Sequence, residues 1–170
     1  MWKIGEQLLY TGKGPARVPF LPGDLLDPYF LEAVWPFYTK PYAPPPELSI
    51  LKSLNPLHGQ VSVVSACFVF DYLNASQQLQ LARGIAGLLS AESGSMVIDI
   101  HSVRTARGDG ETLTNLASSA IYNTPDSWTN LWDGQLFQKG TVKVEVKVVE
   151  SQEAGLSDDG DVMEWAVVRL

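Results

Sequence analysis

Residues 61–70, VSVVSACFVF, restrict the fold of this chain more than any other segment. Apolar side chains occur at both odd and even positions, so a strand made from this run would bury both of its faces. Strands of that kind lie at the centre of parallel sheets that helices cover on both sides. Residues 75–90 follow with apolar residues three and four apart, and Asn74 with Gln77 approximates a capping box. The order predicts an α/β fold.

The rest of the chain extends this pattern. We expect a helix over 2–10, a short edge strand at 18–21, a helix that begins at Asp27-Pro28, a short helix over 47–55 and a buried strand over 95–101. Thr124-Pro125 begins a further helix, for which Gly140 is the predicted stop. Residues 141–150 alternate strictly, and residues 161–170 can pair with them. These elements predict a mostly parallel sheet that ends in an antiparallel hairpin.

Composition narrows the function classes. The 170 residues are 45% hydrophobic and 18% charged, with a net charge of −7, which is typical of one globular domain over 1–170. No stripe of Lys and Arg is present to neutralise phosphates, so we expect no nucleic-acid partner. No apolar run reaches the ~20 residues that span a bilayer, so we expect no membrane partner. A single cysteine and the absence of a signal-peptide pattern favour a cytoplasmic location.

Candidate acid–base groups follow the two predicted buried strands. Asp71 comes directly after residues 61–70, at the edge where α/β sheets bind ligands, and Tyr72 beside it could line a pocket. Asp99 and His101 share one face of the next strand, where a carboxylate would raise the pKa of the imidazole and orient it as a general base. The alternatives are a solvated acid at Asp71 and an ordinary strand end at His101. With only two histidines, in different segments, we expect no metal site.

A proline-rich segment, residues 36–46, and the residues just before it carry several aromatic side chains. Trp35 and Tyr38 could line a site for a hydrophobic substrate, and packing over the sheet is the alternative. Cys67 lies within the apolar run at 61–70, which favours a buried structural thiol over a nucleophile. No Gly-x-Ser-x-Gly motif is present to support a hydrolase.

Several segments resemble one protein family. Residues 2–9, WKIGEQLL, and 18–28, VPFLPGDLLDP, are similar to the surroundings of the third strand in fungal methyltransferases of secondary metabolism, which are class I enzymes that use S-adenosylmethionine. Residues 94–96 (GSM), 124–128 (TPDSW) and 131–133 (LWD) match as well. The resemblance implies a Rossmann-like sheet of strand order 3-2-1-4-5-7-6. It also implies that Asp24, with Leu25, contacts the adenine of the cofactor, and that the substrate is a small hydrophobic metabolite.

The chain departs from this family in three places. We find no counterpart of the first βαβ unit, with its strand, glycine-rich turn and helix that hold the cofactor, so the resemblance covers the C-terminal two-thirds of the fold. The family carries an acid near Ser62 and a histidine where this chain has Asp71. We therefore expect a methyltransferase-like protein that does not bind S-adenosylmethionine as a lone chain. The alternatives are a cofactor-independent cyclase or isomerase on the same scaffold, and a non-catalytic partner subunit.

The missing unit would also leave the strand at 61–70 without a neighbour on one side, and such an apolar edge is a template for pairing. One outcome is that residues 18–21 pair with it directly. Another is a homodimer, or a complex with a partner chain, through the exposed edge. A third is that the gene model is truncated and the native protein is longer. We expect the purified chain not to behave as a clean monomer.

Overall fold

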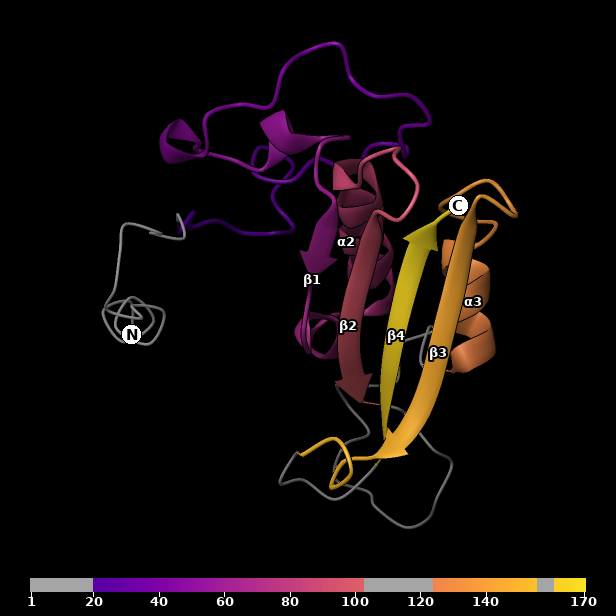
Figure 1. The fold of residues 1–170 in the computed structure, drawn as a ribbon. Helices are drawn as coiled ribbons and strands as arrows, with labels where there is room; N and C mark the ends of the chain where they lie inside the picture. The colour runs from indigo at the N-terminus through magenta and orange to yellow at the C-terminus, as the bar shows by residue number, and fades with distance from the viewer. Residues whose placement is uncertain (1–19, 103–123, 156–160) are drawn as a thin grey trace, which may run out of the picture.

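The computed structural model describes residues 20–102, 124–155 and 161–170. Its described strands are β1 (Val63–Ser65), β2 (Met96–Ser102), β3 (Val142–Glu150) and β4 (Asp161–Arg169), and its described α-helices are α2 (Ala75–Leu88) and α3 (Pro125–Trp132). Three short 3-10 helices, η1 (Leu48–Ile50), η2 (Asn55–Leu57) and η3 (Val69–Tyr72), lie in the first half. Both α-helices lie on the same side of the sheet (Figure 1). No helix among the described residues is long and apolar enough to cross a membrane.

The sheet has the strand order β1-β2-β4-β3. β1 and β2 are parallel, whereas β4 is antiparallel to both β2 and β3. The predicted α/β class and the pairing of residues 141–150 with 161–170 are confirmed. The sheet is mixed, however, because β4 lies between β2 and β3 and so contributes two antiparallel pairings to one parallel pairing. Every position of β3 faces a partner on β4, from Val142 opposite Arg169 to Glu150 opposite Asp161.

The predicted central strand at 61–70 is short and lies at one edge of the described sheet. β1 has three residues, and Val63 is 54% exposed. Three residues after the strand ends, the chain turns at Phe68, whose φ of 58° is in the left-handed region, and η3 follows at once. Phe68 still donates a backbone hydrogen bond of 2.9 Å to the carbonyl of Ile100, so the turn stays attached to β2.

Helix α2 confirms the amphipathic prediction and its capping box. The Asn74 side chain accepts from the backbone of Gln77, and the Gln77 side chain accepts from the backbone of Asn74. Helix α3 begins at the predicted Thr124-Pro125 and has a capping box of its own with Ser127. It ends at Trp132, well before the predicted stop at Gly140. Gly134, with a φ of 133°, turns the chain so that residues 136–137 fold back onto the helix.

Two other helix predictions are wrong. Asp27-Pro28 begins a single turn, in which Leu31 donates to the carbonyl of Asp27, and no helix follows. The Asn55 side chain, far away in sequence, accepts from the backbone of Glu32 at 2.7 Å and donates to the carbonyl of Pro28 at 3.0 Å. These tertiary hydrogen bonds replace those of a helix. The helix predicted over 47–55 is replaced by η1 and the start of η2, and residues 20–21 form no strand. The remaining predicted element, at 2–10, lies outside the described residues, as do residues 18–19.

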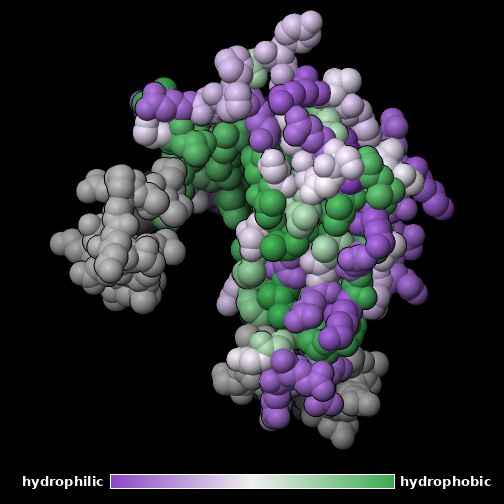
Figure 2. Space-filling view, in the orientation of Figure 1, coloured by the Kyte–Doolittle hydropathy of each residue, from purple (hydrophilic) through white to green (hydrophobic). Residues whose placement is uncertain are grey.

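The core lies between the sheet and the two α-helices. Aromatic rings dominate it near α3, where the Trp128 and Trp165 rings lie 4.8 Å apart and Trp132 contacts both. Side chains that alternate to this face of β4 are buried, including Met163, Trp165 and Val167. The opposite face of the sheet is the one that Figure 1 presents to the viewer. Figure 2 shows hydrophobic side chains gathered over part of that face.

Candidate functional site

The carboxyl ends of β1 and β2 meet at one end of the sheet. Because the two strands are parallel, the residues that follow them lie together, and open α/β sheets bind ligands at such ends. Asp71, in η3 after β1, reaches Ser102, the last residue of β2. Asp99 lies in β2, two residues before His101, and its carboxyl group is close to the backbone of Phe68. The segments that meet at this end of the sheet carry four of the predicted site residues: Asp71, Tyr72, Asp99 and His101.

Asp71 fastens the two strand ends to one another. Its carboxylate accepts hydrogen bonds from the Ser102 backbone at 3.1 and 3.2 Å and from the Ser102 hydroxyl at 2.9 Å. Partial burial raises the pKa of Asp71, and the two kinds of hydrogen bond from Ser102 oppose that rise. Asp71 is an exposed acid, as the solvated alternative predicts, but its hydrogen bonds to Ser102 restrain it. Its neighbour in sequence, Tyr72, is 87% exposed.

Asp99 is a buried carboxyl group without a full set of partners. Its Oδ1 accepts from the backbone of Ile100 at 2.5 Å, whereas Oδ2 is buried and has no hydrogen-bond partner in the described part of the chain. Burial raises the pKa of Asp99 to about 7. The backbone amides of Ile100 and Phe68 lower this pKa, and the nearby charge of Asp71 raises it by a smaller amount. A carboxyl group with such a pKa can give or take a proton near neutrality.

His101 shares a face with Asp99, as predicted, but lies in the aromatic core. Its Nδ1 accepts a hydrogen bond of 3.0 Å from the indole Nε1 of Trp165, and the residue is 1% exposed. The predicted rise of its pKa is wrong, because burial lowers the pKa of His101 to about 4. The ring packs edge-on against Trp128 with centroids 4.7 Å apart. This surrounding favours a structural role for His101 over that of a general base.

The predicted aromatic substrate residues lie elsewhere. Tyr38 packs on the guanidinium of Arg169, 4.8 Å from the ring centroid, and its hydroxyl accepts from the backbone of Gln138 at 2.7 Å. Arg169 belongs to the end of β4 next to Met96, whereas Ser102 lies at the other end of β2. Trp35 is exposed and lines a separate hollow of about 160 Å³ beside α2. The structure therefore does not bring Trp35 and Tyr38 to the Asp71 end of the sheet.

Asp24 and Leu25 form part of a turn. The Asp24 carboxylate accepts from the backbone of Leu26 at 2.9 Å, and Leu25 is half-buried against the core. Gln80 of α2 donates to the carbonyl of Leu26 at 2.7 Å, which fixes this turn to the helix. Asp24 is thus a turn residue whose side chain accepts from the backbone two residues later, and the resemblance alone assigns it to a cofactor.

The described residues do not fit S-adenosylmethionine as the family holds it. In that family the glycine-rich turn follows the first strand and opens a helix, and the described part of the chain contains no such unit: β1 leads to α2 through residues 66–74, which include no glycine. Close approach of the backbone to such a cofactor needs glycine at that turn. No group of three or more His, Cys, Asp or Glu side chains in the described ranges could hold a metal ion.

A shallow hollow on the open face of the sheet was not foreseen from the sequence. It has a volume of about 490 Å³ and crosses all four strands, with Ser65 and Cys67 at the β1 side and Lys147 on β3. Cys67 is exposed and not buried, which corrects the expectation of a buried structural thiol. The signal was present in β2, where Ile98 and Ile100 make the second face of the strand apolar as well.

Neither a protein-family model, nor a curated protein, nor a solved structure matches this chain. The family suggested by the sequence therefore rests on the residues quoted above alone.

Proposed function

We propose that this chain is a methyltransferase-like protein that binds a small hydrophobic metabolite at the carboxyl ends of β1 and β2. The strand order carries the proposal. In methyltransferases of the suggested family the sheet ends in the strand order 4-5-7-6. Strand 7, the last in sequence, is antiparallel and lies between strand 5 and strand 6, its hairpin partner. The described sheet has the same arrangement, β1-β2-β4-β3, with antiparallel β4 between β2 and β3. In this correspondence β1 is strand 4, so the ligand end holds Asp71, Asp99 and Ser102.

In this proposal the chain's own residues supply orientation and a proton site. The Asp71–Ser102 hydrogen bonds hold the ends of β1 and β2 in one geometry, and fixed geometry is the main contribution that a scaffold makes to a transfer reaction. Asp99 supplies a buried acid whose pKa of about 7 suits proton transfer near neutral pH. Tyr72 supplies an exposed aromatic ring beside Asp71 against which a hydrophobic ligand could pack.

S-adenosylmethionine is the cofactor that the proposed family implies, and a methyl sulfonium is the chemistry that it supplies. Because the described residues do not build a cradle for it, we expect the chain alone to bind it weakly or not at all. The test is thermal unfolding with increasing S-adenosylmethionine. A ligand at a hundred times its dissociation constant adds about 2.7 kcal/mol to the free energy of unfolding. A shift that Asp24→Ala abolishes would support the adenine role of Asp24, and no shift at millimolar cofactor would exclude methyl transfer by this chain alone.

A cofactor-independent acid–base enzyme, such as a cyclase or isomerase, is the second candidate. The pKa of Asp99 favours it, because a carboxyl group with a pKa of about 7 can exchange protons without a cofactor. Hydrophobic metabolites that stabilise the chain against heat would be incubated with it and examined for isomeric products. We expect Asp99→Asn to abolish turnover while ligand-induced stabilisation remains. Turnover that persists in Asp99→Asn would exclude this candidate.

A partner at the edge of the sheet is the third element of the proposal. β1 leaves Val63 exposed, and β2 is its only strand neighbour among the described residues. We expect a homodimer, or a complex with another chain, that adds a strand to β1. Sedimentation should then show a species larger than a monomer, and Val63→Lys should dissociate it. A monomer at all concentrations would contradict self-pairing.

The single exposed thiol of Cys67 supports the further expectation of a reducing, cytoplasmic compartment.

A further inference from the structure

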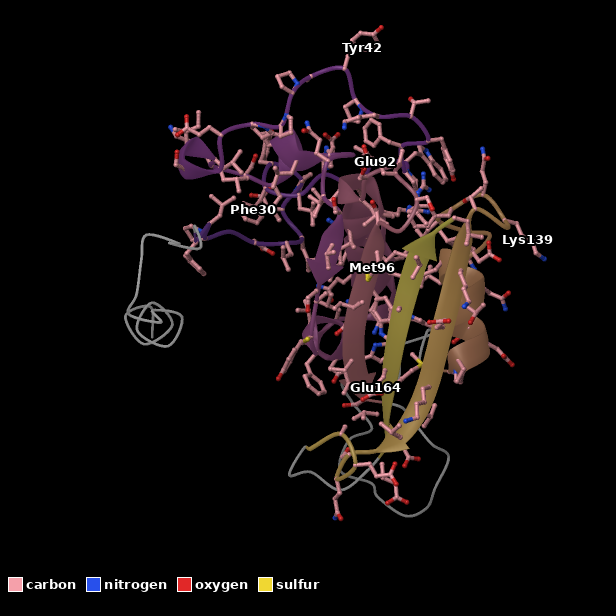
Figure 3. All side chains as sticks on the ribbon, in the orientation of Figure 1. Phe30, Tyr42, Glu92, Met96, Lys139 and Glu164 are labelled. Atoms are coloured by element: carbon pink, nitrogen blue, oxygen red, sulfur yellow. The ribbon has the colours of Figure 1, made fainter. Side chains whose placement is uncertain are left out.

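The hollow of about 160 Å³ beside α2 has no part in the function proposed above. Its walls come from three segments that are distant in sequence, namely residues 33–36, the middle of α2 and the turn after α3. Seven residues line it: Ala33, Val34, Trp35, Pro36, Arg83, Ala86 and Leu136. None of them lines the larger hollow on the open face of the sheet, the face on which Figure 3 shows Met96 and Glu164.

Close packing holds these walls in place. Gly87 of α2 lets residues 33–36 lie directly against the helix, because a Cβ at Gly87 would come within 2.4 Å of Cγ2 of Val34. Pro36 is buried, and its ring fixes its φ. Leu136 is buried as well, and its backbone donates a hydrogen bond of 3.0 Å to the carbonyl of Leu131 in α3. The hollow is therefore formed before any ligand arrives, as most small-molecule sites are.

The walls are apolar and carry one charge. Apart from Trp35 and Arg83, the lining side chains are those of alanine, valine, proline and leucine, and no carboxylate lines the hollow. An apolar cavity of about 150 Å³ can hold benzene, so a hollow of this size fits one ring or a short branched chain. The size and the walls thus select a small apolar molecule.

Trp35 stands at the edge of this hollow with 73% of its surface exposed. Tryptophan is among the more buried residue types on average, and Trp128, Trp132 and Trp165 are all buried here. An exposed indole beside an apolar hollow offers a large contact area and has few rotamers to restrict on binding. The ring of Trp35 therefore suits the flat or apolar part of a ligand.

Arg83 has no hydrogen bond, ion pair or cation–π contact with any residue in the described ranges. By contrast, Lys40 and Lys143 form salt bridges, and Arg169 packs on the ring of Tyr38. A guanidinium can bind a carboxylate through two parallel hydrogen bonds. The apolar walls beside it reduce the screening of its charge by water. Arg83 therefore favours an anionic ligand and disfavours a cationic one.

We propose that this hollow binds a small apolar molecule with one carboxylate group. The apolar body contacts Trp35 and the walls, and the carboxylate pairs with the guanidinium of Arg83. The proposal does not rest on the proposed function, because the carboxyl ends of β1 and β2 contribute no residue to this hollow.

Phenylacetate and its neutral counterpart phenylacetamide are the probes that test this site. In ¹H–¹⁵N NMR titrations, phenylacetate should shift the indole N–H signal of Trp35 and bind about tenfold or more tightly than phenylacetamide. Arg83→Gln should remove this preference. The matched control is Lys139→Gln, which removes an exposed positive charge outside the hollow and should keep the preference (Figure 3). Trp35→Ala, followed at the amide of Ala86, should weaken both probes to the same extent.

Four outcomes would overturn the proposal. Equal affinity for the two probes means that Arg83 does not recognise the carboxylate. A preference that persists in Arg83→Gln, or that Lys139→Gln also removes, means that the charge of the whole chain causes it. Shifts at Ile100 and Ser102 without a shift at Trp35 place the ligand at the ends of β1 and β2, which would support the proposed function and exclude this site. No shift with either probe up to its solubility excludes the site as well.

The amide spectrum of each variant verifies that the chain stays folded.

Discussion

The indole nitrogen of Trp165 donates a 3.0 Å hydrogen bond to Nδ1 of His101, across 64 positions of sequence, inside the aromatic core. The bond requires an unprotonated Nδ1, and the proton of the neutral ring is then on Nε2, which is buried without a partner in the described residues. Asp99 lies on the same face of β2, directly opposite Trp165 on β4. One strand thus buries an acid that prefers to be protonated and an imidazole that prefers to be neutral.

Asp99→Asn should change how stability depends on pH. In the folded chain the pKa of Asp99 is about 7, above its ordinary 3.8, so the native state holds a proton that the unfolded state releases in this range. The native protein therefore loses stability as the pH rises from 3.8 to 7, by up to about 1.4 kcal/mol per pH unit. Relative to the unmodified chain, the variant should gain stability over that range and level off above pH 7. Urea unfolding at several pH values measures this, and parallel profiles would contradict the pKa.

His101→Gln should change the pH dependence of stability in the opposite direction, because it should gain stability relative to the unmodified chain as the pH falls. Burial holds the pKa of His101 at about 4, below its ordinary 6.5, so the unfolded state takes up a proton first as the pH falls. The native protein thus loses the contribution of neutral His101 between pH 6.5 and pH 4. Relative to the unmodified chain, the variant should improve steadily over that range as the pH falls. If its disadvantage is constant with pH, His101 does not titrate as its burial implies.

Features set by neighbours in sequence were predictable. Both capping boxes form because Asn74 with Gln77, and Thr124 with Ser127, satisfy helix N–H groups three residues away, whatever the rest of the fold does. The β3–β4 pairing was predictable from strict alternation in β3, which fixes one face of the hairpin. Asp71 and Asp99 were predicted to lie at one end of the sheet, and they do, because the parallel strands β1 and β2 bring their carboxyl ends together.

Features set by distant residues were not predictable. The neighbouring carboxylate suggested a raised pKa for His101, but burial among Trp128 and Trp165 has the larger effect and lowers it. Tyr38 was assigned to a substrate site on composition, whereas its partner is Arg169, at the opposite end of β4 from the residues that pair with Ser102. His101 and Tyr38 both contact residues more than 60 positions away in sequence. A local sequence pattern does not indicate such contacts.

Gly87→Ala should destabilise the chain although alanine is the better helix former. A Cβ at Gly87 of α2 would lie 2.4 Å from Cγ2 of Val34, closer than any real contact, and 3.2 Å from the Val34 carbonyl. An exposed Gly→Ala change in a helix gains up to about 1 kcal/mol, but overpacking costs about 1–3 kcal/mol. We expect the cost of overpacking to exceed the gain in helix propensity, so Gly87→Ala should lower the midpoint of urea unfolding.

Val34→Ala is the matched test of that cause. It removes the methyl group that Gly87→Ala would contact, so the double variant should be more stable than the sum of the two single effects predicts. A coupling of at least about 0.5 kcal/mol is expected for residues in direct contact. Strict additivity would mean that Gly87 does not fix the segment around Val34 to α2.

The Asp71–Ser102 contact should couple the ends of β1 and β2 energetically. Ser102→Ala removes the hydroxyl donor and keeps the backbone donor, whereas Asp71→Ala removes the acceptor of both. Each hydrogen bond contributes about 0.5–1.5 kcal/mol, and the partial exposure of Asp71 favours the lower end. A double-mutant cycle in urea should give a positive coupling that weakens as the pH falls and Asp71, whose pKa is raised, takes up a proton, because protonation removes the charge that strengthens the bond. A coupling near zero at pH 7 would show that the hydrogen bond from the Ser102 hydroxyl to Asp71 does not hold the two strand ends together.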